Sequence, residues 1–141
     1  MSLQTIQISQ SFNASVNNIF DTLSDHDTFG KLIGVPMKRI KDGETCVNGL
    51  GSIRDIKIGL LPSFQETITG FVDGQFIEYK ITKGSPIKNH VGTLKFSEAN
   101  GVTTLDYTIK LESKIPFTTG LIKAALGNGI RKGLKKYSNS L

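Results

Sequence analysis

The sequence predicts an α+β fold, in which a curved antiparallel sheet wraps around a long C-terminal helix and two short helices follow the first strand. Three observations lead to this fold class. Residues 6–12 alternate between apolar and polar side chains, as in a strand with one buried face. From residue 37 to about residue 113, strand-like segments follow one another between glycine-containing turns. After Pro116 the apolar residues take the spacing of a helix.

The residues after the first strand predict the two short helices. Asn13 or Ser15 can cap the first helix, and the segment Ser24–Asp27 can end it and cap the second. Gly34 is expected to close the second helix. We expect His26 in the polar turn between the helices, in contact with solvent. The apolar stripes consist of Val16, Ile19, Phe20 and Leu23 in the first helix and Phe29, Leu32 and Ile33 in the second.

The middle of the chain predicts five to six consecutive antiparallel strands. Asp42-Gly43, Asp73-Gly74 and Asn100-Gly101 are hairpin signals, and further turns are expected at Gly59–Pro62 and Lys83–Pro86. A meander of this kind buries one of its faces. The strands are expected at residues 37–40, 52–58, 64–72, 75–82, 88–96 and 102–112.

The C-terminal segment predicts one helix with an apolar stripe and a basic end. Its interior glycines predict either a kink or a face where bulk is unwelcome. The basic end is either a solvated face or a docking surface for anionic lipid headgroups. The stripe consists of Ile122, Leu126, Ile130, Leu134 or Gly133, and Tyr137; the glycines are Gly120, Gly127, Gly129 and Gly133; the basic residues are Lys123, Arg131, Lys132, Lys135 and Lys136.

Composition narrows the class of protein. With 141 residues, we expect a single domain over residues 1–141. A net charge of +5 without interleaved aromatic residues gives no sign of nucleic-acid binding. The sequence contains no run of ~18 apolar residues, so we expect no stable membrane insertion. The single Cys46 and the lack of a visible export signal favour the cytoplasm. The sequence contains no Cys/His cluster, so we expect neither a metal site nor another cofactor.

Strand parity predicts which side chains share the concave face of the sheet, because successive residues of a strand point to opposite sides. That face is largely apolar with a few polar groups, the composition of a small-molecule pocket. The predicted ligand-binding residues are Arg54, Ile56, Glu66, Ile68, Tyr79, His90, Leu94, Tyr107, Ile109, Ile122 and Leu126.

The polar residues of this face allow two interpretations each. Arg54 and Glu66 can meet inside the cavity, either to orient a ligand or as a structural ion pair. His90 is either a general acid or base, or a single histidine at the rim of the sheet. Tyr79 and Tyr107 either donate hydrogen bonds to a ligand or are core residues with locally bonded hydroxyls.

The order of these elements, with their residues, resembles a known group of proteins. The residues that carry the resemblance are Ala14–Asp25, Gly49–Arg54, Glu66–Ile68, Ile77–Ile81 and Gly101–Tyr107. Together they resemble the START-like (SRPBCC) superfamily, and within it the polyketide cyclase/dehydrase-type lipid-binding branch. The resemblance covers essentially the whole chain. It implies a helix-grip fold with a cavity between the curved sheet and the C-terminal helix.

Three functions are compatible with these observations. The first is binding of a hydrophobic small molecule, such as a lipid, isoprenoid, quinone or polyketide-like compound, in that cavity. The second is a polyketide cyclase/dehydratase-like enzyme, in which Arg54 polarises a carbonyl and Glu66 or His90 moves a proton. The third is a protein-interaction module whose own side chains fill the cavity. The first is favoured, because the resemblance predicts a cavity more directly than a reaction.

Overall fold

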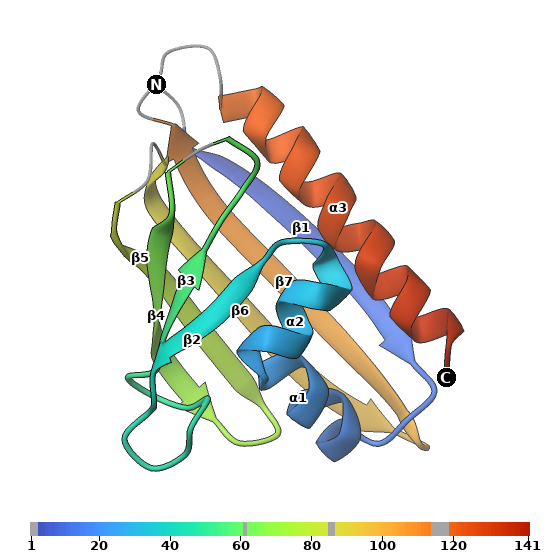
Figure 1. The fold of residues 1–141 in the computed structure, drawn as a ribbon. Helices are drawn as coiled ribbons and strands as arrows, with labels where there is room; N and C mark the ends of the chain where they lie inside the picture. Colours follow the sequence, from blue (N-terminus) through green and yellow to red (C-terminus); the bar gives the residue numbers. More distant parts are fainter. Residues whose placement is uncertain (1–2, 61, 85–86, 114–118) are drawn as a thin grey trace.

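The computed structural model describes residues 3–60, 62–84, 87–113 and 119–141. It confirms the helix-grip fold: a seven-stranded antiparallel sheet in the order β1-β7-β6-β5-β4-β3-β2 curves around α3, and α1 and α2 follow the first strand (Figure 1). The elements are β1 (Gln4–Phe12), α1 (Val16–Ser24), α2 (His26–Ile33), β2 (Met37–Lys41), β3 (Ile53–Ile56), β4 (Phe64–Val72), β5 (Phe76–Lys83), β6 (Ile87–Ala99), β7 (Val102–Ser113) and α3 (Thr119–Asn139).

The two short helices begin and end at the residues whose chemistry predicts it. The Ser15 hydroxyl accepts a hydrogen bond from the Asn18 amide at 3.4 Å and caps α1. The Asp25 carboxylate accepts one from the Thr28 amide at 3.1 Å and caps α2. Gly34 ends α2 with a φ of 73°, a left-handed conformation that suits glycine. Both helices lie on the concave side of the sheet (Figure 1).

Two of the three hairpin signals are tight turns and one is not. Asn100 and Gly101 have φ angles of 53° and 78°, as a two-residue turn between β6 and β7 requires. Asp73 and Gly74 lie in the short turn between β4 and β5. At Asp42-Gly43 the predicted hairpin is present, since β2 and β3 pair antiparallel, but its connection is the longer loop of residues 42–52 instead of a two-residue turn.

Local contacts explain this longer loop. Asp42 accepts a hydrogen bond from Arg39 Nε at 2.9 Å, and the Gly43 amide donates to the Val47 carbonyl at 3.1 Å. These bonds close a local turn over residues 43–47 before the chain reaches β3. It re-enters the sheet after Gly51, whose φ is 86°. The predicted turn and boundary residues Leu61, Ser85, Pro86 and Pro116 lie outside the described residues.

The helix α3 lies along β1 and against α2 (Figure 1). Its apolar stripe is buried at Ile130 and Leu134. A Cβ at Gly133 would overlap the Leu32 carbonyl oxygen, so this glycine permits close contact between the helix backbones. Bulk is therefore unwelcome at Gly133, whereas a Cβ at Gly120 would meet nothing within 4 Å. Gly133 is therefore required for close packing of α3, whereas Gly120 is not.

The outer side of α3 carries the basic residues. Lys132, Lys135 and Lys136 are exposed, and Arg131 Nη2 donates to the Gln7 carbonyl of β1 at 3.2 Å. Within the described part of the chain, no helix combines the length and apolar character needed to cross a membrane. The single Cys46 is exposed.

Candidate functional site

Arg54 and Glu66 form a buried ion pair across neighbouring strands. They lie opposite each other in the register between β3 and β4. Arg54 Nε donates to Glu66 Oε1 at 2.8 Å, and Arg54 Nη2 lies 2.7 Å from the same oxygen without the direction of a hydrogen bond. The residues are only 3% and 4% exposed. The predicted meeting of these two side chains is confirmed, and both arginine contacts go to one carboxylate oxygen.

The guanidinium of Arg54 is enclosed on its other sides. Its Cζ lies 4.5 Å from the centre of the Tyr79 ring and 5.5 Å from that of Phe29, and Nη1 is 3.3 Å from His26 Nδ1. Burial is the largest single effect and acts against the charge, but the Glu66 carboxylate together with Tyr79 and Tyr107 outweighs it, so the pKa of Arg54 is raised. Arg54 is therefore permanently charged, and the surrounding side chains enclose its guanidinium.

The structure corrects the prediction for His26. This residue is the first of α2 and is 0% exposed, not solvated. Because a guanidinium only donates, Nδ1 accepts from Arg54, and Nε2–H then donates to the Ser52 hydroxyl at 2.9 Å. Burial and the nearby Arg54 charge lower the pKa of His26 to about 3. The His26 ring is therefore neutral, and its two hydrogen bonds connect Arg54 of the ion pair to Ser52.

Tyr79 and Tyr107 join their hydroxyl groups in a hydrogen bond, so each hydroxyl has a local partner in the absence of a ligand. Burial is the main reason that the pKa of both phenols is raised, and both stay neutral donors. Tyr79 lies opposite Gly92 in the register between β5 and β6. A Cβ at Gly92 would overlap the Tyr79 ring, so the absence of a side chain there leaves room for the phenol.

His90 projects from β6 beside Tyr79, at a distance of 5.6 Å between the ring centres. It is 7% exposed, and its Nδ1 has no hydrogen-bond partner. Nδ1 faces Glu66 Oε2 across 3.9 Å, which is too long for a direct hydrogen bond. Burial lowers the pKa of His90, although Glu66 opposes this effect. His90 is therefore neutral and keeps one hydrogen-bonding position available.

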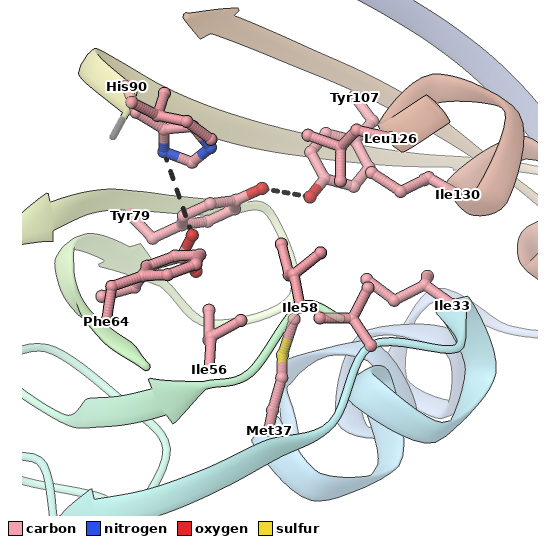
Figure 2. A pocket seen from close by; sticks show the side chains of 13 residues that line it. Ile33, Met37, Ile56, Ile58, Phe64, Tyr79, His90, Tyr107, Leu126 and Ile130 are labelled. Atoms are coloured by element: carbon pink, nitrogen blue, oxygen red, sulfur yellow. Dashed lines mark hydrogen bonds and ion pairs between the residues drawn. The ribbon is translucent and has the colours of Figure 1, made fainter. Parts of the chain in front are cut away.

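An inner cavity of about 30 Å³ lies where these polar groups meet (Figure 2). A volume of this size admits one or two atoms the size of a water oxygen. Arg54 is absent from its lining, whereas Glu66 is present. The cavity is lined by Ile33, Val35, Met37, Ile56, Ile58, Phe64, Glu66, Tyr79, Ile87, His90, Tyr107, Leu126 and Ile130.

An outer pocket of about 270 Å³ adjoins the inner cavity beneath the first half of α3. The two share Ile33, Val35, Ile58, Ile87 and Leu126, so they lie next to each other; together they are called the hollow, with a wide apolar part and a narrow polar end. The outer pocket is lined by Ile33, Gly34, Val35, Ile58, Ile87, Ile122, Ala125, Leu126 and Gly129.

Seven of the predicted ligand-binding residues line this hollow. They are Ile56, Glu66, Tyr79, His90, Tyr107, Ile122 and Leu126. Four lie outside the lining: Arg54, which is held behind Glu66, and Ile68, Leu94 and Ile109, which are buried in the hydrophobic core.

For Ile68 and Leu94 the reason is that α1 fills the other end of the concave face, whereas Ile109 lies on the far side of Tyr107 from α1, opposite Ile6 of β1. Phe20 packs against Phe71 and Phe96 with ring centres 5.3 and 5.1 Å apart. The hollow therefore occupies only the end of the face that α1 does not cover.

Several of the lining residues that the predicted set omits reach the hollow from outside the middle strands. Val35 lies in the connection between α2 and β2, which has no periodicity to follow. Ile130 belongs to the predicted stripe of α3, so that spacing was the available signal. The lining residues not included in the predicted set are Ile33, Gly34, Val35, Met37, Ile58, Phe64, Ile87, Ala125, Gly129 and Ile130.

No group of three or more His, Cys, Asp or Glu side chains in the described ranges is arranged to hold a metal ion.

Comparison with known proteins agrees with this geometry. The family described as "Polyketide cyclase / dehydrase and lipid transport" matches residues 4–139. The chain belongs to this family. Its membership confirms the resemblance to the START-like (SRPBCC) superfamily and gives the chain a fold associated with hydrophobic ligands. No curated protein matches the sequence.

Solved structures similar to this family member share its fold at low identity. A START superfamily protein from Mycobacterium smegmatis has a TM-score of 0.78 and 12% identity, covering 96% of this chain and 97% of that one. A truncated norcoclaurine synthase from Thalictrum flavum gives 0.72 and 13%, covering 96% and 93%. The Aha1 dimer from Colwellia psychrerythraea gives 0.70 and 14%, covering 98% and 96%. Such identities establish the fold alone.

Proposed function

We propose that this protein binds an apolar small molecule of the lipid, isoprenoid, quinone or polyketide-like class between the sheet and α3. The observation that carries the proposal is the outer pocket of about 270 Å³, whose lining side chains are all aliphatic. Its size is close to the lower end of ligand pockets, roughly 300 Å³. The ligand's apolar part occupies this pocket and its end points to the inner cavity.

The predicted residues take different parts in this proposal. Ile122 and Leu126 contact the apolar part, and Glu66, Tyr79, His90 and Tyr107 contact the ligand's inner end. Arg54 acts through Glu66, as a positioning residue. The single exposed Cys46 keeps the cytoplasm as the proposed location.

The first test is native mass spectrometry of freshly purified protein, followed by identification of any compound released on denaturation. A stoichiometric apolar compound is the expected result. A thermal-shift panel of lipids, quinones and polyketide-like compounds extends the test, because a ligand that binds only the folded state raises Tm. A protein that carries no compound and responds to none of the panel favours the interaction module instead.

A pair of neighbouring variants locates the binding. Ala125 lines the outer pocket, whereas Ala124 does not line it, and both are exposed on α3. Ala125→Phe is expected to fill the pocket and abolish the ligand-induced rise in Tm. Ala124→Phe adds the same bulk to the same helix and is expected to leave that rise intact. Equal responses in both variants would place the ligand elsewhere.

A cyclase or dehydratase-like reaction is a second candidate, and one observation favours it. Glu66 and His90 both line the inner cavity, so a carboxylate and an imidazole, two groups able to move a proton, face the ligand's end. If the protein is an enzyme, Glu66→Gln or His90→Ala abolishes turnover of the bound compound while binding persists. Incubation of that compound with the protein, followed by mass spectrometry, reveals ring closure or loss of water.

A further inference from the structure

The inner cavity offers an unusual combination of charges to a ligand. Its lining contains the anionic Glu66, but the arginine that balances Glu66 lies behind the lining. The other polar lining groups are His90, Tyr79 and Tyr107, all neutral. No cation among the lining residues is therefore free to pair with an anionic head group.

A charged head group of either sign is disfavoured in such a cavity. At about 30 Å³, the cavity admits a charged group only without its hydration shell. A carboxylate would lie beside Glu66 in a poorly solvated place, which costs free energy because like charges repel and desolvation is not compensated. An ammonium group would compete with Arg54, which already pairs with Glu66 at 2.7–2.8 Å.

A neutral hydroxyl group fits the same place. Glu66 Oε2 and His90 Nδ1 face each other across 3.9 Å, and Nδ1 has no partner. An oxygen about 2.8 Å from both atoms subtends an angle of roughly 90° between them, which a hydroxyl can accept. The hydroxyl donates its proton to Oε2 and accepts a hydrogen bond from Nδ1–H, so both protein groups gain a partner.

We propose that the inner cavity recognises the terminal hydroxyl group of an apolar alcohol through Glu66 and His90, and that it discriminates against carboxylates and amines. This proposal rests on the proposed function and adds the chemical class of the ligand's polar end. The apolar tail of the alcohol extends into the outer pocket past Leu126, which borders both parts of the hollow.

The test uses four probes with the same apolar chain: 1-decanol, decanoate, decylammonium and decyl methyl ether. Their dissociation constants are measured by calorimetric titration of the full chain at about pH 7.5, where both ionisable probes are charged. 1-Decanol is expected to bind at least about tenfold more tightly than each of the other three. The ether is the neutral control, because it accepts a hydrogen bond but donates none.

Two variants connect the preference to the named residues. His90→Leu keeps the ion pair and removes the bridging nitrogen, so 1-decanol is expected to lose about tenfold in affinity and approach the ether. Thr93→Leu is the matched control, because Thr93 lines a pocket with Gln7 and Lys95 rather than the inner cavity and binding is expected to be unchanged. Glu66→Gln leaves Arg54 unpaired, so decanoate is expected to become the preferred probe; if this variant does not fold, His90→Leu carries the test.

The outcomes separate the two proposals. If decanoate, decylammonium or the ether binds the native protein as tightly as 1-decanol, the hydroxyl proposal is wrong and apolar binding stands. If His90→Leu leaves the affinity for 1-decanol unchanged, the proposed bridge is wrong. If none of the probes binds and the wider apolar panel also gives no thermal shift, the proposed function fails together with this inference.

Discussion

Arg54 and Glu66 show how a costly pair of charges is accommodated in an apolar sheet. Each lies on the inward parity of its strand, and the antiparallel register places them directly opposite each other. Desolvation of both charges offsets much of their attraction, so the intact pair contributes little net stability. Removal of one partner is a different matter, because the remaining charge is buried without compensation.

We therefore predict that Arg54→Met lowers the free energy of unfolding by about 3–5 kcal/mol, because Glu66 loses its counter-charge. The double variant Arg54→Met/Glu66→Leu is expected to recover most of this loss, since no buried charge remains. Urea denaturation monitored by circular dichroism measures both changes. A double variant as unstable as the single one would contradict the account.

His26 makes stability depend on pH. Its pKa is lowered from 6.5 to about 3 in the folded state, so unfolding takes up a proton when the pH is below 6.5. Stability contributed by the neutral ring is full above pH 6.5 and is lost as the pH falls toward 3. Between pH 7 and pH 5 we expect a loss of about 2 kcal/mol from this residue. The lowered pKa of His90 acts in the same direction.

The matched measurement compares the native protein with His26→Gln by urea denaturation at several pH values. Glutamine cannot titrate, so the variant is expected to lose less stability on acidification, whatever its stability at neutral pH. Identical pH dependence in the two proteins would show that His26 is not responsible.

At the scale of the element, α3 depends on one glycine for its position. A Cβ at Gly133 would overlap the Leu32 carbonyl of α2, whereas a Cβ at Gly129 would find its nearest atom, the Ile33 carbonyl oxygen, at 3.8 Å. Gly133→Ala is expected to destabilise the protein by about 1–3 kcal/mol. Gly129→Ala is expected to be neutral or to stabilise by up to about 1 kcal/mol, because alanine favours the helix. Thermal unfolding of both variants measures the difference.

The elements also show which features a sequence can reveal. Strand parity identified Glu66, Tyr79, His90 and Tyr107, because alternation is a local property of the chain. The burial of His26 could not be found in this way, since its partners Ser52 and Arg54 lie 26 and 28 residues further along.

The position of the hollow on the sheet could not be predicted from the sequence either. It depends on how far α1 brings Phe20 over the concave face, where this ring meets Phe71 and Phe96. These contacts join three distant segments, so no local pattern shows that Ile68 and Leu94 belong to the packed core.

At the scale of the whole molecule, the sheet is unevenly supported. The interior strand β7 pairs with β1 on one side and β6 on the other, while β2 is an edge strand paired only with β3. Residues of β2 are half-buried or exposed. We predict that amides of β7 exchange with solvent deuterium only on global unfolding, whereas those of β2 exchange faster through local opening. Hydrogen-exchange mass spectrometry tests this, and equal protection of both strands would contradict it.

Gly92 does not line the hollow, but its lack of a side chain determines how much space the inner cavity has. The Tyr79 ring occupies the space that a larger residue at position 92 would take, and a methyl group there would push the phenol toward the inner cavity. Descendants of this sequence could therefore close or reopen the polar end by one substitution on the neighbouring strand, with every lining residue unchanged. Proteins of this fold can thus gain or lose a receptor site by a change that comparison of their binding residues would overlook.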